Sequence, residues 1–176
     1  YFQYLIDRYK GSTTNNAIIN GMSKLIYGKG LDATDSSRTP DQYAQLRSLI
    51  SNDCLKSAVM DRKMLGMAAL QVTYDTGLVK KVTLFPMQTL RAEKCNEDGE
   101  VEAWYYHPDW SKIKPSDQPK RIPAFGFGGK KGNELYIVSS YVTGSYYYPP
   151  VDYQGALPYA VLEEEIADYL INDTIN

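Results

Sequence analysis

The spacing of apolar residues changes at Gly66, and this change constrains the fold more than any other feature of the sequence. Before Gly66, apolar residues recur at the spacing of amphipathic helices. After Gly66, short runs rich in β-branched and aromatic residues are separated by turn signals, which is typical of antiparallel strands. A last helical pattern begins at Pro158. The order of helices, strands and a final helix predicts an α+β fold in which helices pack on an antiparallel sheet.

Three helices are expected before Gly66. Ser12 is a candidate N-cap for a helix over residues 13–27, which Gly28 ends. Residues 40–65 form two more helices with a break near Asn52, and Pro40 suits the first helical position. The first helix has apolar residues at helical spacing, at Ile18, Met22, Leu25 and Ile26. We expect the second helix to bury a stripe formed by Tyr43, Leu46, Leu49 and Ile50.

The strands are expected in two hairpins and one further segment. Asp75-Thr76-Gly77 and the Asn96–Gly99 segment supply the turns. Residues 108–133, which contain four prolines, are expected to form a long loop. The tract from Tyr146 to Pro150 is expected to be extended, because proline restricts the residues before it. The predicted strands span residues 70–74, 78–85, 88–95, 101–107 and 135–142.

Composition excludes some classes of function. The formal net charge of −2 argues against a protein that binds nucleic acid through bulk phosphate attraction, although a local basic patch stays possible. No apolar run is long enough for a membrane-spanning helix. Cys54 and Cys95 lie far apart without a signal peptide, which favours two free thiols. The 16 tyrosines suit half-buried strands and interfaces.

Catalytic and metal sites are not indicated. His107 is the only histidine, and no Gly-x-Ser-x-Gly elbow accompanies it, so a hydrolase centred on His107 is a minor alternative. The glycines around Lys29 end a helix, whereas phosphate binding uses a helix start. Glu163, Glu164 and Glu165 lack the histidine partner of a di-metal helix and are expected to form a solvated or interface face. We therefore expect no enzyme, no cofactor and no metal.

The long loop supports a second interpretation. Between residues 110 and 131, basic residues alternate with Trp110, Phe125 and Phe127. Such a mixture can bind single-stranded nucleic acid by charge and stacking. A solvated loop is the more common meaning of such a charge cluster. A nucleic-acid-binding module that uses loop 110–131 is kept as the alternative function.

Both ends of the sequence suggest a piece of a longer protein. The chain begins at Tyr1 rather than at methionine, and it stops at Asn176 inside a helical pattern without an end signal. We therefore expect that part of the parent protein's function lies outside these residues.

Three segments resemble the portal proteins of tailed bacteriophages. Residues 17–31 resemble an early portal helix that ends in glycine, and residues 120–125, Lys-Arg-Ile-Pro-Ala-Phe, resemble a loop between wing strands. The most specific likeness is residues 141–176, in which a tyrosine- and glycine-rich loop leads into a helix. Pro150 departs from the portal pattern, in which an uninterrupted loop is expected at this position. The resemblance implies that residues 1–176 form a single α+β domain from the wing region, with the stem, clip and crown absent.

The resemblance also implies a structural role. Portal proteins form a ring, expected to be a dodecamer, at one capsid vertex, where DNA is packaged and later ejected. The implied partners are further copies of the chain, the capsid protein, the terminase through regions not present here, and double-stranded DNA that passes without sequence specificity. The implied location is the virion, or the host cytoplasm during assembly, and the gene could belong to a prophage. No membrane partner is expected. Our candidates for contact with a subunit or the capsid are Tyr146, Tyr147, Tyr148 and Tyr153.

Overall fold

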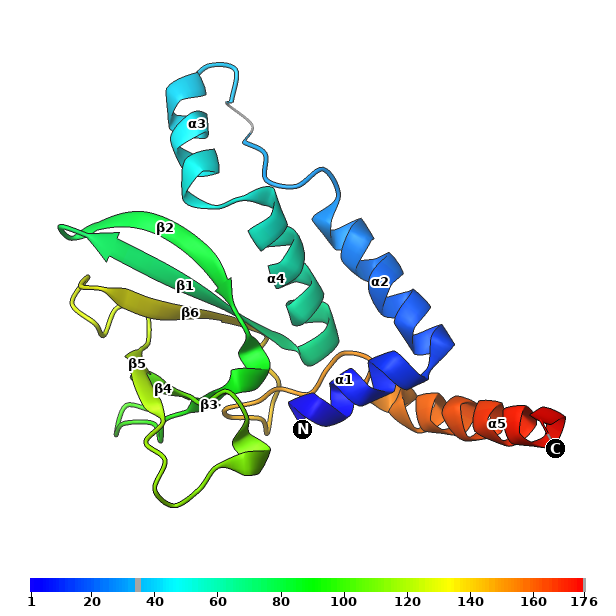
Figure 1. Cartoon of the computed structure of the whole chain (residues 1–176). Coiled ribbons are helices and arrows are strands. Elements are labelled where there is room, and N and C mark those ends of the chain that lie inside the picture. Colours follow the sequence, from blue (N-terminus) through cyan, green and yellow to red (C-terminus); the bar gives the residue numbers. More distant parts are fainter. Residues whose placement is uncertain (34–35, 176) are drawn as a thin grey trace.

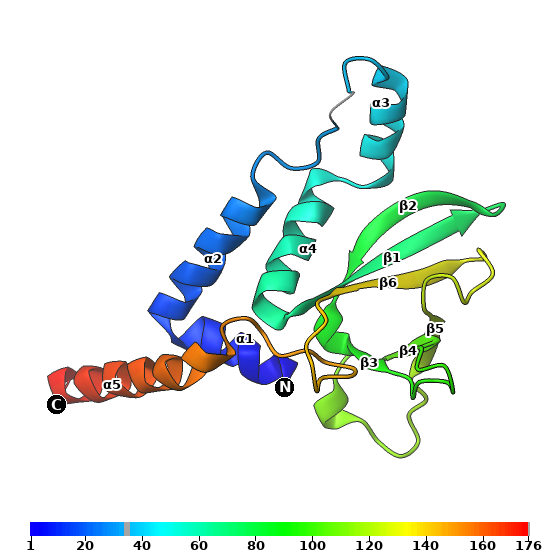
Figure 2. The ribbon, with the colours of Figure 1, turned by 180° about the vertical axis from the view of Figure 1, so that it is seen from behind.

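The computed structural model describes residues 1–33 and 36–175, and it has the predicted α+β fold (Figure 1). Four helices precede the strands: α1 (Phe2–Gly11), α2 (Thr13–Tyr27), α3 (Pro40–Leu49) and α4 (Asn52–Leu65). Helix α5 (Leu157–Ile175) closes the described chain. Helices α1, α2 and α4 pack together beside the strands, α3 lies at one tip, and α5 projects away from the body (Figures 1 and 2).

The strands form two antiparallel sheets rather than one. The first sheet has the order β2-β1-β6, with β1 (Met67–Asp75), β2 (Leu78–Phe85) and β6 (Asn133–Ser139). The second has the order β3-β4-β5, with β3 (Leu90–Ala92), β4 (Ala103–Tyr106) and β5 (Lys120–Pro123). A parallel bridge between Ala124 and Leu135 joins the two sheets. The predicted hairpin at Asp75-Thr76-Gly77 is confirmed, because Asp75 pairs with Leu78.

Gly66 is the joint at which the helical half meets the sheet. It ends α4 in the left-handed conformation, with φ of 77°, and β1 begins at the next residue. A Cβ atom at this position would lie 3.2 Å from the carbonyl oxygen of Pro149. The positive φ and the close approach both favour glycine, so the change of period has a structural cause.

Two elements depart from the prediction. Helix α1 was not expected; no side chain caps its start, so it lacks the signal that identified α2. Strand β5 lies inside the segment that we expected to be a loop. It has four residues, and it forms because Trp104 and Ile122 pair across the β4–β5 ladder, a contact that no local pattern encodes.

The core lies where the two sheets meet α1 and the end of α4. Leu5, Leu65, Met87 and Leu90 are fully buried there, and Trp104 adds the largest ring. Leu157 brings the first turn of α5 into the same cluster. The core therefore holds only the start of α5, and the rest of that helix is supported by other contacts.

Candidate assembly surfaces

Helix α5 is docked on the body by a carboxylate at the end of another helix. Glu163 accepts hydrogen bonds from the hydroxyls of Ser12 and Thr14, the latter at 2.8 Å, and from the backbone N–H of Thr14 at 3.3 Å. These groups lie at the N-terminus of α2, where Ser12 also acts as the predicted N-cap through Asn15. A helix N-terminus carries partial positive charge, which favours a carboxylate. Hydrogen bonds from Ser12 and Thr14 hold the pKa of Glu163 below its ordinary value.

The next residue of α5 fixes the helix to α1. A carboxylate oxygen of Glu164 lies 2.6 Å from a guanidinium nitrogen of Arg8. Gly11 permits this approach, since a Cβ atom there would lie 2.3 Å from a carboxylate oxygen of Glu164. The expectation of a merely solvated or interface face was therefore wrong for Glu163 and Glu164, which join α5 to the α1–α2 corner. The spacing of acidic residues alone gave no sign of these partners.

Helix α5 also presents an apolar surface to solvent, on both sides of Glu163 and Glu164 in the sequence. Every residue from 165 to 175 is exposed. Tyr159, Leu162, Ile166 and Tyr169 follow a three-four-three spacing, which places them on one side of the helix. All four are at least half exposed, with Ile166 at 50%. We call these four residues the α5 stripe.

Helix α2 has a second exposed stripe, which is formed by apolar residues of its helical pattern. Ile18, Met22 and Leu25 are exposed, with Leu25 at 76%, and we call these three residues the α2 stripe. Ile26 is 58% exposed. The buried side of α2 instead carries Asn15, Ile19 and Ser23. The helix was predicted correctly, but the periodicity did not show which side packs inward.

The stripe expected on α3 is not buried either. No residue of α3 is buried, and Leu46 is 38% exposed. Tyr43 is half-buried, and its hydroxyl donates to the carbonyl of Leu31 at 3.1 Å. Helix α3 lies at the tip of the molecule, where few elements can cover it (Figure 1).

The tyrosine tract lies along the open edge of β3. The hydroxyl of Tyr148 accepts from the backbone N–H of Ala92 at 2.8 Å, and that of Tyr147 accepts from the N–H of Cys95 at 3.1 Å. Tyr146 donates to the carbonyl of Gly99 at 2.6 Å. Tyr147 and Tyr148 are half-buried, whereas Tyr146 is 63% exposed. The tract therefore protects a sheet edge, and Tyr146 presents the most ring surface.

Tyr153 lies apart from this edge. It is half-buried, and its hydroxyl donates to the carbonyl of Met64 near the end of α4 at 2.5 Å. Burial raises the pKa of this phenol above its ordinary value. All four candidate contact residues thus have hydroxyl partners in the chain, and Tyr147, Tyr148 and Tyr153 are also half-buried. Their part in assembly stays a prediction.

The segment from 110 to 131 is divided into two regions. At one end, Trp110 packs into the body: its indole N–H donates to the carbonyl of Thr89 at 2.8 Å, and its ring lies under Arg91. Arg121 forms two hydrogen bonds with Glu93, at 2.8 and 2.7 Å. Trp110 is half-buried, whereas Arg121 is exposed beside its carboxylate partner. The lysines of this segment are exposed, and the interpretation of loop 110–131 as a nucleic-acid-binding surface stays a prediction.

At the other end, a buried carboxylate organises the turn before β6. Glu134 is fully buried and accepts from the backbone N–H groups of Gly126 at 2.9 Å and Lys130 at 3.1 Å. Burial raises the pKa of Glu134, but these hydrogen bonds outweigh it, so the pKa lies below the ordinary value. The turn presents Phe125 and Phe127, each about half exposed. Glu134 was not among the residues singled out from the sequence, where a lone acid near several glycines was its only signal.

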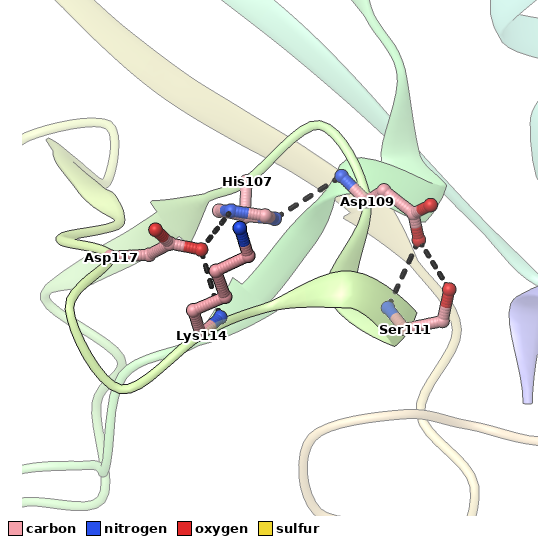
Figure 3. A network of polar contacts seen from close by, with 5 residues as sticks. All are labelled: His107, Asp109, Ser111, Lys114 and Asp117. Carbon is pink, nitrogen blue, oxygen red and sulfur yellow. Dashed lines mark hydrogen bonds and ion pairs between the residues drawn. The ribbon is translucent and has the colours of Figure 1, made fainter.

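His107 holds a loop together (Figure 3). Its Nδ1 accepts from the backbone N–H of Asp109 at 3.2 Å, and its Nε2 lies 3.6 Å from a carboxylate oxygen of Asp117. The same oxygen of Asp117 accepts from the N–H of Lys114 at 2.8 Å. Ser111, the nearby hydroxyl, donates to Asp109 rather than to the imidazole. These contacts close a turn, and they do not align a nucleophile with a base.

The described residues hold neither a metal-binding group of side chains nor a helix that could span a membrane. Within residues 1–33 and 36–175, no group of three or more His, Cys, Asp or Glu side chains is placed to hold a metal ion. Over the same residues, no helix is both long enough and apolar enough to span a bilayer. Cys54 and Cys95 are both free thiols.

Comparisons with known proteins show what the fold resembles. No known protein family matches the sequence, and no curated protein matches it. One similar solved structure is described as the neck of an empty GTA particle computed with C6 symmetry, where GTA denotes a phage-like gene transfer agent. The TM-score is 0.72 at 10% identity over 96% of this chain. The match covers 44% of the other chain, so this chain spans less than half of its length. At this identity the likeness establishes the fold alone.

Proposed function

We propose that this chain is a structural segment of a ring-forming protein in the neck of a phage-like particle. The observation that carries the proposal is the likeness to a neck structure over nearly the whole chain. Further support comes from the exposed apolar stripes on α2 and α5, because contiguous apolar surface of this kind marks contact with other proteins.

The more specific form of the proposal is a portal protein. In this form the chain belongs to the wing, the ring lies at one capsid vertex, and double-stranded DNA passes through it without sequence recognition. The net charge of −2 suits such a channel, because tight binding of phosphates would slow sliding. The partners would be further copies, the capsid protein and, through other regions of the parent protein, a terminase. The location would be the virion.

The proposed role is not catalytic. The hydrogen bonds of His107, Asp109 and Ser111 are used to close a turn, which leaves the imidazole without an activated hydroxyl. A hydrolase centred on His107 would require activity that His107→Ala abolishes. A structural protein requires none.

Labelling of particles tests the proposal. An antibody raised against this chain is applied to purified phage-like particles from the source organism, and bound label is located by electron microscopy. The proposal predicts label at one position on each particle, where the head meets the tail. Label spread over the shell, or particles that lack the chain, would contradict it.

Binding of nucleic acid by the turn before β6 is a second candidate function. Phe125 and Phe127 are exposed beside Lys130 and Lys131, and exposed rings with adjacent lysines can stack on and attract a single strand. Salt-dependent binding of a labelled single-stranded oligonucleotide, lost in the double variant Phe125→Ala/Phe127→Ala, would support this candidate. Absence of binding at low salt would eliminate it.

A further inference from the structure

Two apolar helix surfaces of this chain are left without a partner. The α5 stripe (Tyr159, Leu162, Ile166 and Tyr169) and the α2 stripe (Ile18, Met22 and Leu25) are both exposed. Each has the three- and four-residue spacing by which one helix packs along another. Exposed stripes of this kind are costly in water unless another surface covers them.

The two stripes do not cover each other within one chain. Near the start of α5, Ile18 and Tyr159 line a common groove with Glu163. From this corner the two helices diverge: α2 runs towards α3, and α5 runs away from the body (Figures 1 and 2). The Glu163 and Glu164 contacts hold α5 in this direction. Leu25 and Ile166 are therefore left uncovered by the described residues.

The charges of the two helices favour a contact between α5 and α2 over a contact between two copies of α5. Helix α5 contains five acidic residues and no basic residue; the acids are Glu163, Glu164, Glu165, Asp168 and Asp173. Two copies of α5 side by side would therefore repel each other. Residues 13–30 contain no acidic residue, and of their two lysines Lys24 lines the groove between α2 and α4, while Lys29 is exposed just after the end of α2. An α2 surface is thus the electrostatically complementary partner for an α5 surface.

We propose that the α5 stripe of one copy packs on the α2 stripe of a second copy. This inference rests on the proposed function, for which it names the surfaces that join neighbouring copies. The contact is heterologous, because the patch on one copy differs from the patch on the next. Repetition of a heterologous contact builds a ring when the rotation closes. In such a ring each copy makes the contact twice, once through each helix.

Cysteine cross-linking tests the pairing directly. Both native cysteines are first replaced, by Cys54→Ser and Cys95→Ser. One preparation then carries Leu25→Cys and another carries Ile166→Cys, and the two chains bear tags of different mass. The preparations are mixed at high concentration and treated with a short bis-maleimide, and the products are separated by mass. Circular dichroism establishes that each variant is folded.

The proposal predicts that the mixed product exceeds both self-linked products several-fold. The matched control replaces Ile166→Cys with Asp168→Cys, which lies on the opposite side of the same helix and should give several-fold less mixed product. Charge reversal supplies a second readout: Lys29→Glu should reduce the mixed product.

Other outcomes overturn the pairing and separate it from the proposed function. A dominant product between two Ile166→Cys chains would show that α5 packs on α5. Equal products from the test and control pairs would show random collision. No product from either pair would show that the stripes do not meet. In each of these cases the labelling of particles still decides whether the chain belongs to a particle neck.

Discussion

The carboxylate of Glu163 accepts a hydrogen bond from the hydroxyl of Ser12, although these residues lie at opposite ends of the described chain. Ser12 is also the N-cap of α2, so one residue both begins that helix and receives α5. The contact sets the direction in which α5 leaves the body, and with it the position of the α5 stripe. The position of the α5 stripe therefore depends on this polar contact as well as on the packing of Leu157 in the core.

Removal of the charge on Glu163 should weaken this contact. Glu163→Gln keeps the shape of the side chain but loses the favourable interaction of a carboxylate with the N-terminus of α2. We expect a lower midpoint of urea unfolding. Glu165→Gln is the matched control, because Glu165 is exposed on the same helix, and its midpoint should stay close to that of the parent chain. Equal effects of the two substitutions would contradict the role of Glu163.

The stabilisation that Glu163 provides should depend on pH. The pKa of Glu163 lies below its ordinary value of 4.5, so ionised Glu163 stabilises the folded chain at pH values above 4.5. This stability is lost as the pH falls through the lower pKa of the folded state. The difference in unfolding midpoint between the parent chain and Glu163→Gln should therefore shrink as the pH is lowered. A difference that grows towards low pH would reverse the assignment.

Asp61 on α4 should have the opposite pH dependence. Burial raises its pKa from 3.8 to about 6, so the folded chain binds this proton more tightly than the unfolded chain does. Stability from protonated Asp61 is fully present below pH 3.8 and is lost as the pH rises through about 6. Asp61→Asn should then stabilise the chain at pH 7 by about 2 kcal/mol and have little effect at low pH. Urea unfolding at several pH values measures this, and an equal effect at all pH values would refute it.

Glu134 should matter for stability more than other acidic residues. Glu134→Ala leaves the backbone N–H groups of Gly126 and Lys130 without their acceptor, which should cost about 3 kcal/mol of unfolding free energy. Glu97→Ala, at an exposed turn position, should change stability by less than about 0.5 kcal/mol. A cost of similar size at both positions would show that the buried carboxylate does not organise the turn.

The hydroxyl of Tyr148 should stabilise the edge of β3. Tyr148→Phe keeps the ring, which packs against Phe2 and Trp104, but removes the acceptor for the N–H of Ala92. We expect a loss of about 1 kcal/mol in unfolding free energy. The control is Tyr141→Phe, since Tyr141 is 89% exposed, and it should be close to neutral. Faster hydrogen exchange at the Ala92 amide would locate the effect.

The sequence was sufficient for the elements that carry their own boundary signals. Ser12 and Gly28 delimit α2, Gly66 ends α4, and the Asp75–Gly77 turn places β1 beside β2. Helix α1 has no side-chain cap, and β5 is held by pairing with β4. These two elements depend on contacts between distant residues, which local patterns do not contain.

The assembly surfaces were harder to predict than the fold. Amphipathic spacing identified α2 correctly, yet its stripe of Ile18, Met22 and Leu25 faces solvent while Asn15 and Ser23 are buried. Periodicity shows that a helix has an apolar side, but the location of the core determines whether that side is covered. For the same reason the partners of Glu163 and Glu134 became visible only in three dimensions.

The mass of the protein in solution decides whether the chain belongs to a ring-forming protein. Light scattering coupled to size exclusion is applied to the full protein that carries these residues, at low and at physiological salt. A ring-forming protein should give a closed ring whose mass is a whole multiple of the subunit mass, and Leu25→Glu, on the α2 stripe, should reduce that mass. A protein that stays monomeric under every salt condition would contradict the account.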